Sequence, residues 1–111
     1  MIAILRLPGA LAAIDHALLV MAPSPEQASE LHYLRSQAGS ADPLQDLRAA
    51  LKENPDNAEA LTAIADVLAR QNEYRKAAEY AKRAAALAPY DSALAQKAQD
   101  LQKLVPSGQL P

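Results

Sequence analysis

The side chains that could carry out chemistry are few in this sequence. His16 and His32 are its two histidines, and there is no cysteine to act as a nucleophile or a thiolate ligand. Asp15 precedes His16, but adjacent residues on a helix point about 100° apart, so the two form no dyad. Neither histidine has a partner at metal-ligand spacing, and no glycine-rich phosphate loop is present. We therefore expect surface histidines, no cofactor and no enzymatic activity, with a shared metal or catalytic site as the weaker alternative.

A strip of basic residues is the second group that could bind a ligand. Arg75, Lys76, Lys82 and Arg83 recur on one predicted helix, on the side away from its small residues. An acidic partner is one interpretation of this strip. Glu79 lies within it, however, and can pair with Arg83 one turn later. We therefore favour a solvated outer face.

The elements that must position these residues are helices. The 111 residues suffice for one domain but not for two independent ones. Half of them are hydrophobic, and many of these are Ala, the residue with the highest helix propensity. Apolar residues recur at helical spacing and never at strand spacing. The sequence predicts a single all-α domain over residues 1–105 and a disordered tail over 106–111.

The net charge and the N-terminal stretch limit the possible partners and the location of the protein in the cell. The formal net charge is −2, which gives no positive field to attract a phosphate backbone, so we expect no nucleic-acid partner. The most apolar stretch, 1–22, is interrupted by Arg6, Pro8 and Asp15, so its unbroken apolar runs are shorter than the roughly 18 residues that a spanning helix needs. It also lacks the basic start of a secretory signal. We expect a cytoplasmic protein without membrane insertion.

Helix-start signals divide the chain into six helices. Ser24 and Asp42 each precede a proline and stand three residues before a glutamine, which is typical of a capped helix start. Asp56 repeats this device without the internal proline, and Asp91 is expected to cap the last helix. Asn72 is expected to serve as both turn and cap. The predicted inward side chains, in helix order, are Leu11, Ile14, Leu18 and Met21; Ala28, Leu31, Leu34 and Ala38; Leu44, Leu47 and Leu51; Leu61, Ile64, Ala65 and Leu68; Ala77, Tyr80, Ala81, Ala84 and Leu87; and Leu94, Ala98, Leu101, Leu104 and Val105.

A self-similar period links two of these hairpins. Pro55 and Pro89 stand 34 positions apart, each after an Ala-rich helix, and 34 is the period of one class of helical repeat. Over residues 56–91 the chain resembles a tetratricopeptide repeat. The matching positions are Leu61, Ile64, Ala65 and Leu68 on the first helix, and Ala77, Ala81 and Pro89 on and after the second. Leu61, Leu68 and Ala81 replace the usual aromatic residues, and Tyr74 and Tyr80 are expected to supply the missing bulk.

The resemblance implies antiparallel helical hairpins stacked as a short right-handed superhelix. Its best repeat is 58–91, a degenerate repeat covers 24–55, and 92–105 resembles a capping helix. Residues 7–18 resemble the second helix of a preceding repeat.

The resemblance also implies a function. In tetratricopeptide arrays the first helix of each pair lines a concave groove that holds a partner's peptide. The chain is therefore expected to be a protein-interaction module or adaptor that binds a peptide in this groove. For the groove residues, ordinary surface is an equal alternative, which an Asp66–Arg70 pair at favourable helical spacing supports. The expected groove residues are Glu59, Thr62, Asp66, Arg70, Gln96, Lys97 and Asp100.

The apolar N-terminus suggests a different class of function. Ile2, Ile4 and Leu5 are too apolar to leave in water, and such patches usually mark an interface. About three repeats are needed for a self-sufficient solenoid, and fewer are readable here. We expect these residues to pack against another copy in a homo-oligomer. The alternative function is thus a structural self-assembling subunit or a fragment of a longer repeat array.

Overall fold

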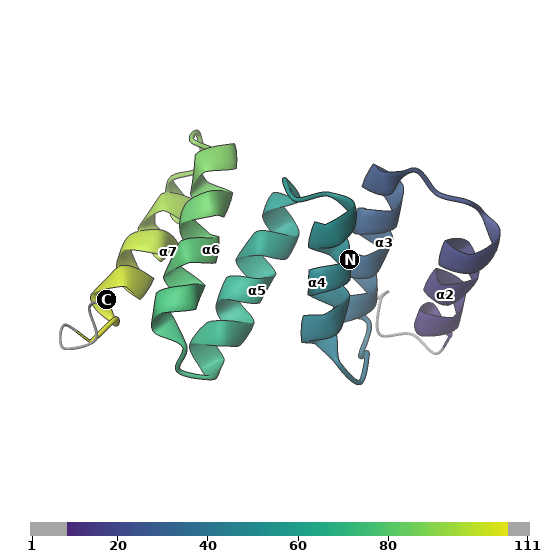
Figure 1. Ribbon diagram of the computed structural model, residues 1–111, viewed down its shortest axis with the longest axis horizontal. Coiled ribbons are helices and arrows are strands. Elements are labelled where there is room, and N and C mark those ends of the chain that lie inside the picture. Colours follow the sequence, from purple (N-terminus) through teal and green to yellow (C-terminus); the bar gives the residue numbers. More distant parts are fainter. Residues whose placement is uncertain (1–8, 107–111) are drawn as a thin grey trace. The chain divides into compact units, whose positions relative to one another are not determined.

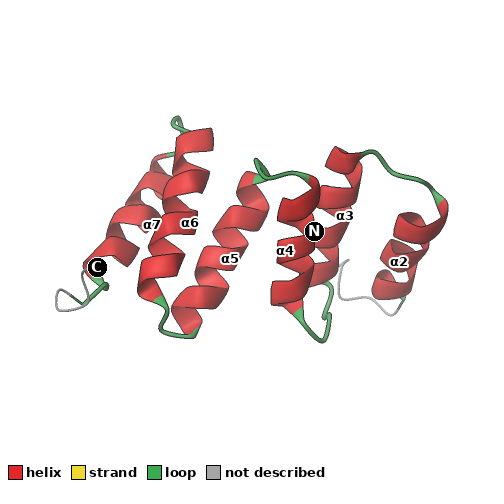
Figure 2. Cartoon of the chain, in the orientation of Figure 1, coloured by secondary structure: helices red, strands yellow, loops and turns green. Residues whose placement is uncertain are grey.

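The computed structural model describes residues 9–106, and this part of the chain contains six helices and no strand (Figures 1 and 2). The predicted all-α class is confirmed. The proposed self-association residues Ile2, Ile4 and Leu5 lie outside the described residues, as does the predicted tail apart from Pro106. The helices are α2 (Ala10–Val20), α3 (Pro25–Gln37), α4 (Pro43–Glu53), α5 (Ala58–Arg70), α6 (Tyr74–Leu87) and α7 (Ser92–Lys103).

Three helices begin where their capping residues predict. At the start of α3, the backbone N–H of Gln27 donates to Ser24 Oγ (3.2 Å), and the Ser24 N–H donates to Gln27 Oε1 (3.0 Å), so the capping box is complete. Asp42 Oδ1 accepts from the Gln45 N–H at 3.2 Å and caps α4. Asp91 Oδ1 accepts from the Ala93 N–H at 3.0 Å and caps α7. These bonds satisfy helix N–H groups that have no partner within the helix.

Two other predicted caps are wrong by one residue. Helix α5 is capped by Asn57, whose Oδ1 accepts from the Ala60 N–H at 3.1 Å, whereas the N–H of Asp56 binds Asn54 Oδ1 in the preceding turn. The N-cap of α6 is Glu73 rather than Asn72. The predicted turn at Asn72 is confirmed, because this residue has a left-handed backbone (φ 64°) after the end of α5 and the Glu73 N–H bonds to the Leu68 carbonyl at 2.9 Å.

The chain forms two compact units, of which the first spans residues 1–60. Within it α3 packs against α4, and α2 contacts α3. Ile14, Ala28, Leu47 and Ala50 are its buried apolar residues before α5 begins. Gly39, which follows α3, has φ 89°, a left-handed backbone conformation that glycine adopts without strain and that is suited to ending a helix.

The second unit spans residues 61–111. Helix α6 packs against α7, and Asp66 of α5 binds Lys97 of α7. Leu61, Ile64, Ala65 and Leu68 are at most 4% exposed, so the predicted inward stripe of α5 is confirmed. Helix α6 buries only alanines, and their small side chains allow neighbouring backbones to approach closely. These are Ala77, Ala78, Ala81 and Ala84.

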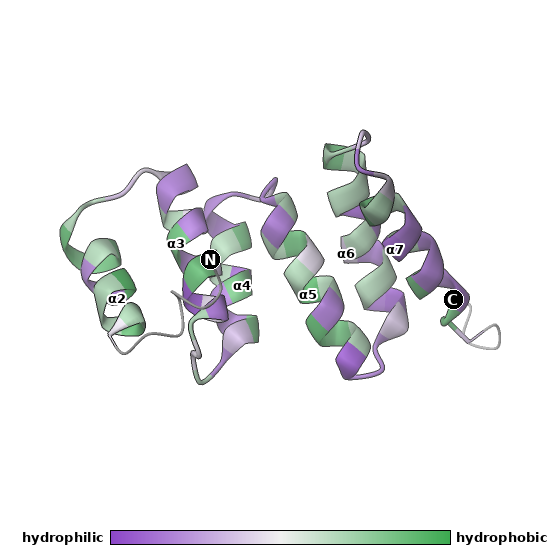
Figure 3. Ribbon diagram, turned by 180° about the vertical axis from the view of Figure 1, so that it is seen from behind, coloured by the Kyte–Doolittle hydropathy of each residue, from purple (hydrophilic) through white to green (hydrophobic). Residues whose placement is uncertain are grey.

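Three residues predicted to point inward are exposed. Met21 is 70% exposed, Leu87 41% and Leu104 52%. Each stands at the last residue of a helix or just after it. Periodicity gives the direction of a side chain, but it does not tell whether another element lies opposite a helix end. Figure 3 shows that most of α2 consists of apolar residues and that few of its positions are hydrophilic.

Candidate functional site

The predicted partner-binding residues centre on an ion pair between α5 and α7. Lys97 Nζ lies 2.7 Å from Asp66 Oδ1, and the two side chains are 34% and 45% exposed. Partial burial makes such a pair stronger than a fully exposed one. The predicted Asp66–Arg70 pair is wrong, because within residues 9–106 the carboxylate of Asp66 pairs with Lys97 instead. The ion pair fixes the positions of two charges from helices that are distant in sequence.

The other predicted groove residues are only partly brought together. Gln96 Nε2 donates to Asp100 Oδ1 at 2.8 Å, and these two residues lie one turn apart on the exposed side of α7. Thr62 is half-buried and Arg70 is exposed. Glu59 is exposed and belongs to the first unit, whereas the other six residues belong to the second. The structure thus joins Asp66 with Lys97 and Gln96 with Asp100, and binding of a partner by this set stays a prediction.

Within the first unit, Glu59 of α5 acts on two residues of α3. Burial raises the pKa of the Glu30 carboxyl, and the negative charge of Glu59 raises it further. Burial, then Glu59 and then Glu30 raise the pKa of the Tyr33 hydroxyl. Glu59 was predicted as a groove residue, whereas its electrostatic effect on Glu30 and Tyr33 was not predicted from sequence. The spacing of Glu30 and Tyr33 places both on one side of α3, but only the fold brings Glu59 close to them.

Replacing Glu59 with Gln is expected to lower the pKa of both Glu30 and Tyr33, because loss of the neighbouring charge favours their ionised forms. A raised pKa in the folded state means that Glu30 reduces folding stability as pH rises through its titration range. The substitution should therefore weaken that pH dependence. NMR titration of the Glu30 carboxyl and the Tyr33 ring measures both shifts. Glu53→Gln on α4 is the matched control, and an unchanged Glu30 pKa in Glu59→Gln would contradict the assignment.

Arg35 forms the densest polar cluster in the described residues, and it was not predicted. Its Nε donates to Asp15 of α2 at 2.8 Å, and its Nη1 donates to Asp46 of α4 at 3.0 Å and to Ser40 Oγ at 2.9 Å. The Asp46 side chain is only 10% exposed. Hydrogen bonds to Asp15 and then to Asp46 raise the pKa of Arg35. Its first role is structural, since one guanidinium ties α2, α3 and α4 together.

The basic strip is exposed along α6, as predicted, but the expected ion pair between Glu79 and Arg83 is not observed. The Arg83 guanidinium lies 5.4 Å from the centre of the Tyr80 ring, and in the described part of the chain it forms no ion pair with Glu79. Lys76 Nζ lies 3.7 Å from Glu73 in a weak exposed contact. Tyr80, predicted to point inward, is only half-buried. The strip therefore keeps most of its positive charge.

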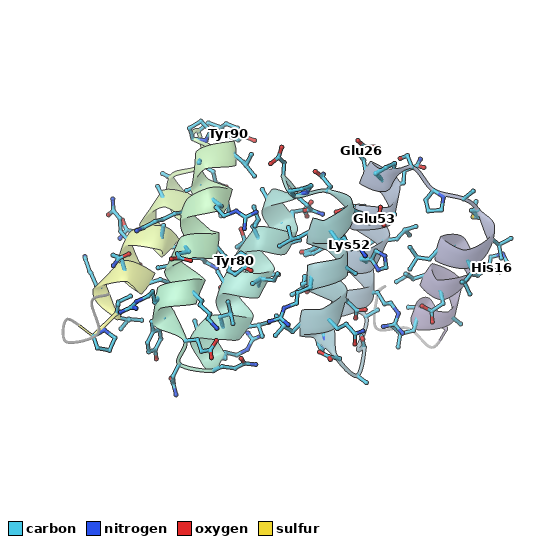
Figure 4. The ribbon with its side chains drawn as sticks, viewed as in Figure 1. His16, Glu26, Lys52, Glu53, Tyr80 and Tyr90 are labelled. Carbon is cyan, nitrogen blue, oxygen red and sulfur yellow. The ribbon has the colours of Figure 1, made fainter. Side chains whose placement is uncertain are left out.

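The two histidines lie on different helices. His16 is exposed on α2 and lies at the outer side of that helix (Figure 4), and His32 is half-buried on α3. Among residues 9–106 no group of three His, Cys, Asp or Glu side chains is placed to hold a metal ion. No helix within the described residues is long and apolar enough to cross a membrane.

Comparison with known proteins leaves the family open. No protein-family model matches the chain, and no curated protein matches it. The tetratricopeptide resemblance therefore rests on residue pattern alone and enters below as a proposal.

Proposed function

We propose that this chain is a non-enzymatic protein-interaction module that binds a peptide segment of a partner on the exposed side of α5 and α7. The observation that carries the proposal is the division of α5 into two faces. Leu61, Ile64 and Leu68 are buried on one face, whereas Asp66 on another holds Lys97 at the surface. The buried face anchors the helix, and the partly exposed face can contact a ligand.

The tetratricopeptide resemblance supports this location. The proposed arrangement is a single domain over 1–105 in which helical hairpins stack as a short right-handed superhelix, with the first helix of each pair on the concave side. The 34-residue spacing of Pro55 and Pro89 and the small residues on α6 favour it. In that arrangement Glu59, Thr62 and Asp66 follow the concave face of α5. The proposed partner is another cytoplasmic protein.

The chemistry of this surface favours a ligand with charges of both signs. Asp66 and Lys97 are held together at 2.7 Å, so both side chains are already ordered before a ligand binds. The exposed Gln96–Asp100 pair adds an amide and a carboxylate on α7, within one turn of Lys97. An extended peptide can bond to such groups through its own backbone and through complementary side chains. Shape and charge complementarity supply specificity without a reaction.

A charge reversal tests the proposal. Peptides selected from a random library on the intact chain should bind Asp66→Lys with Arg70→Glu at least about tenfold more weakly, because the reversal places like charges where the ligand's charges fit. Fluorescence anisotropy of a labelled selected peptide measures the dissociation constant. Glu79→Lys with Arg83→Glu reverses an equal number of charges on α6 and should leave binding unchanged. Equal affinity for intact chain and α5 variant would reject this surface.

A structural self-assembling subunit is the second candidate function. Leu19, Val20 and Met21 favour it, since all three are more than 60% exposed at the end of α2. The α5 reversal separates the two candidates, because it should abolish peptide capture and leave self-assembly intact.

A further inference from the structure

Charge is divided unequally between the two units of the chain. Residues 1–60 contain eight acidic and four basic side chains, a formal net charge of −4. Residues 61–111 contain five acidic and seven basic side chains, a net charge of +2. Opposite net charges on two parts of one chain favour attraction between different parts of two copies.

The acidic unit contains a hollow that could receive a positively charged element. It is open, has a volume of about 680 Å³, and is lined by α2, α3, α4 and the turn before α4. Three carboxylates and one guanidinium contribute to its wall, so it keeps a net negative charge after the Arg35 ion pairs are formed. We call it the acidic hollow, and its main lining residues are Asp15, Leu18, Leu19, Arg35, Asp42 and Asp46.

One wall of the acidic hollow is apolar and continues onto open surface. Leu19, which lines it, is 84% exposed, and the neighbouring Val20 and Met21 are 65% and 70% exposed. Helix α2 has only Asp15 and His16 as polar residues among its eleven. A helix that is apolar on all sides is normally covered by more than one neighbour. The hollow therefore combines negative charge with apolar surface that a partner could cover.

The same chain carries a surface of matching chemistry on α6. Arg75, Lys76, Lys82 and Arg83 are exposed on the basic strip, and Tyr80 lies beneath the Arg83 guanidinium. Arg and Tyr are the residue types most often found at the energetic centre of interfaces. A guanidinium stacked on an aromatic ring loses little side-chain freedom on binding, so this pair is suited to act as an anchor.

We propose that copies of this chain associate head to tail, with the basic strip of one copy seated on the acidic hollow of the next. The Tyr80–Arg83 anchor then meets the apolar wall at Leu19 and the carboxylates of Asp15 and Asp42. A two-fold contact between two acidic hollows would bring like charges together, so the contact joins different surfaces. Such a contact builds rings or open chains of copies. It specifies the surfaces used by the self-assembly candidate and does not depend on peptide capture.

Two variants and their mixture test this contact. Asp42→Asn with Gln45→Lys makes the hollow less negative and retains a side-chain oxygen to cap α4. Lys82→Glu with Arg83→Glu makes the strip negative. Sedimentation velocity over a range of protein concentrations should show oligomers for the intact chain, and each variant alone should associate at least about tenfold more weakly. Mixing the two variants should restore association, because each supplies the surface that the other retains.

Controls separate this contact from other outcomes. Lys52→Glu, at an exposed position of α4, lies outside both surfaces and should leave the oligomers unchanged. Circular dichroism verifies that each variant is helical. Association of the intact chain should also weaken between about 0.05 M and 0.5 M salt, a test that needs no variant. An intact chain that stays monomeric rejects both this contact and self-assembly. Association that survives strip reversal or high salt, or a mixture that stays monomeric, rejects the head-to-tail contact while leaving peptide capture untouched.

Discussion

Replacing Leu61 with Ala is expected to lower the free energy of unfolding by roughly 2–5 kcal/mol, the range for a fully buried leucine. Leu61 is 0% exposed and lies on the buried stripe of α5 with Ile64 and Leu68. Truncation leaves a cavity that the surrounding structure fills only in part, which adds to the loss of buried apolar surface. Urea unfolding followed by circular dichroism at 222 nm measures the change. A loss of this size is a large share of the stability of an ordinary small domain.

Leu19→Ala is the matched control for the same chemical change. Leu19 is 84% exposed, so its truncation should alter the unfolding free energy by no more than about 0.5 kcal/mol when measured at low protein concentration. Equal effects of the two substitutions would show that Leu61 is not in a packed core. That result would also remove the basis for an exposed recognition face on α5, because a helix without a buried face has no fixed orientation.

The helices could be predicted from sequence because their signals are local. Ser24, Asp42 and Asp91 each bond to a backbone N–H two or three residues away, so sequence spacing alone identifies them. The one-residue error at α5 has a nonlocal cause. Asn57, rather than Asp56, lies where it also bonds to Ser29, which is 28 residues earlier in the chain. A cap that is chosen by tertiary contacts is not visible in a four-residue window.

The candidate sites were predictable only to the level of a helix face. Asp66 and Lys97 were both expected on one surface, but their ion pair spans 31 residues and was not expected. Arg35 was missed because its partners Asp15 and Asp46 lie 20 and 11 residues away on other helices. Polar residues within helices usually indicate solvent-facing positions. Asp46 and Ser29 are buried because a donor or acceptor on another element satisfies each of them.

The buried polar network around Asn57 should contribute as much to stability as a large apolar side chain. Asn57 Oδ1 accepts from the Ala60 N–H at 3.1 Å, and its Nδ2 donates to Ser29 Oγ at 2.9 Å. Ser29 Oγ in turn donates to the Ala50 carbonyl at 2.7 Å. The network thus joins α3, the last turns of α4 and the first turn of α5 within the first unit. Ser29, Asn57 and Ala60 are all less than 9% exposed, so water cannot easily replace a lost partner.

Asn57→Ala is therefore expected to lower the unfolding free energy by roughly 2–4 kcal/mol, about 1 for the lost cap and the remainder for polar groups left unsatisfied in the interior. Asp91→Ala removes an exposed cap at α7 and should cost only about 1 kcal/mol. Asn57→Asp keeps the acceptor for Ala60 but cannot donate to Ser29, so its effect should lie between the two. Urea unfolding of the three variants orders them directly. If Asn57→Ala and Asp91→Ala destabilise equally, water reaches the network, and its hydrogen bonds contribute no more than an exposed cap does.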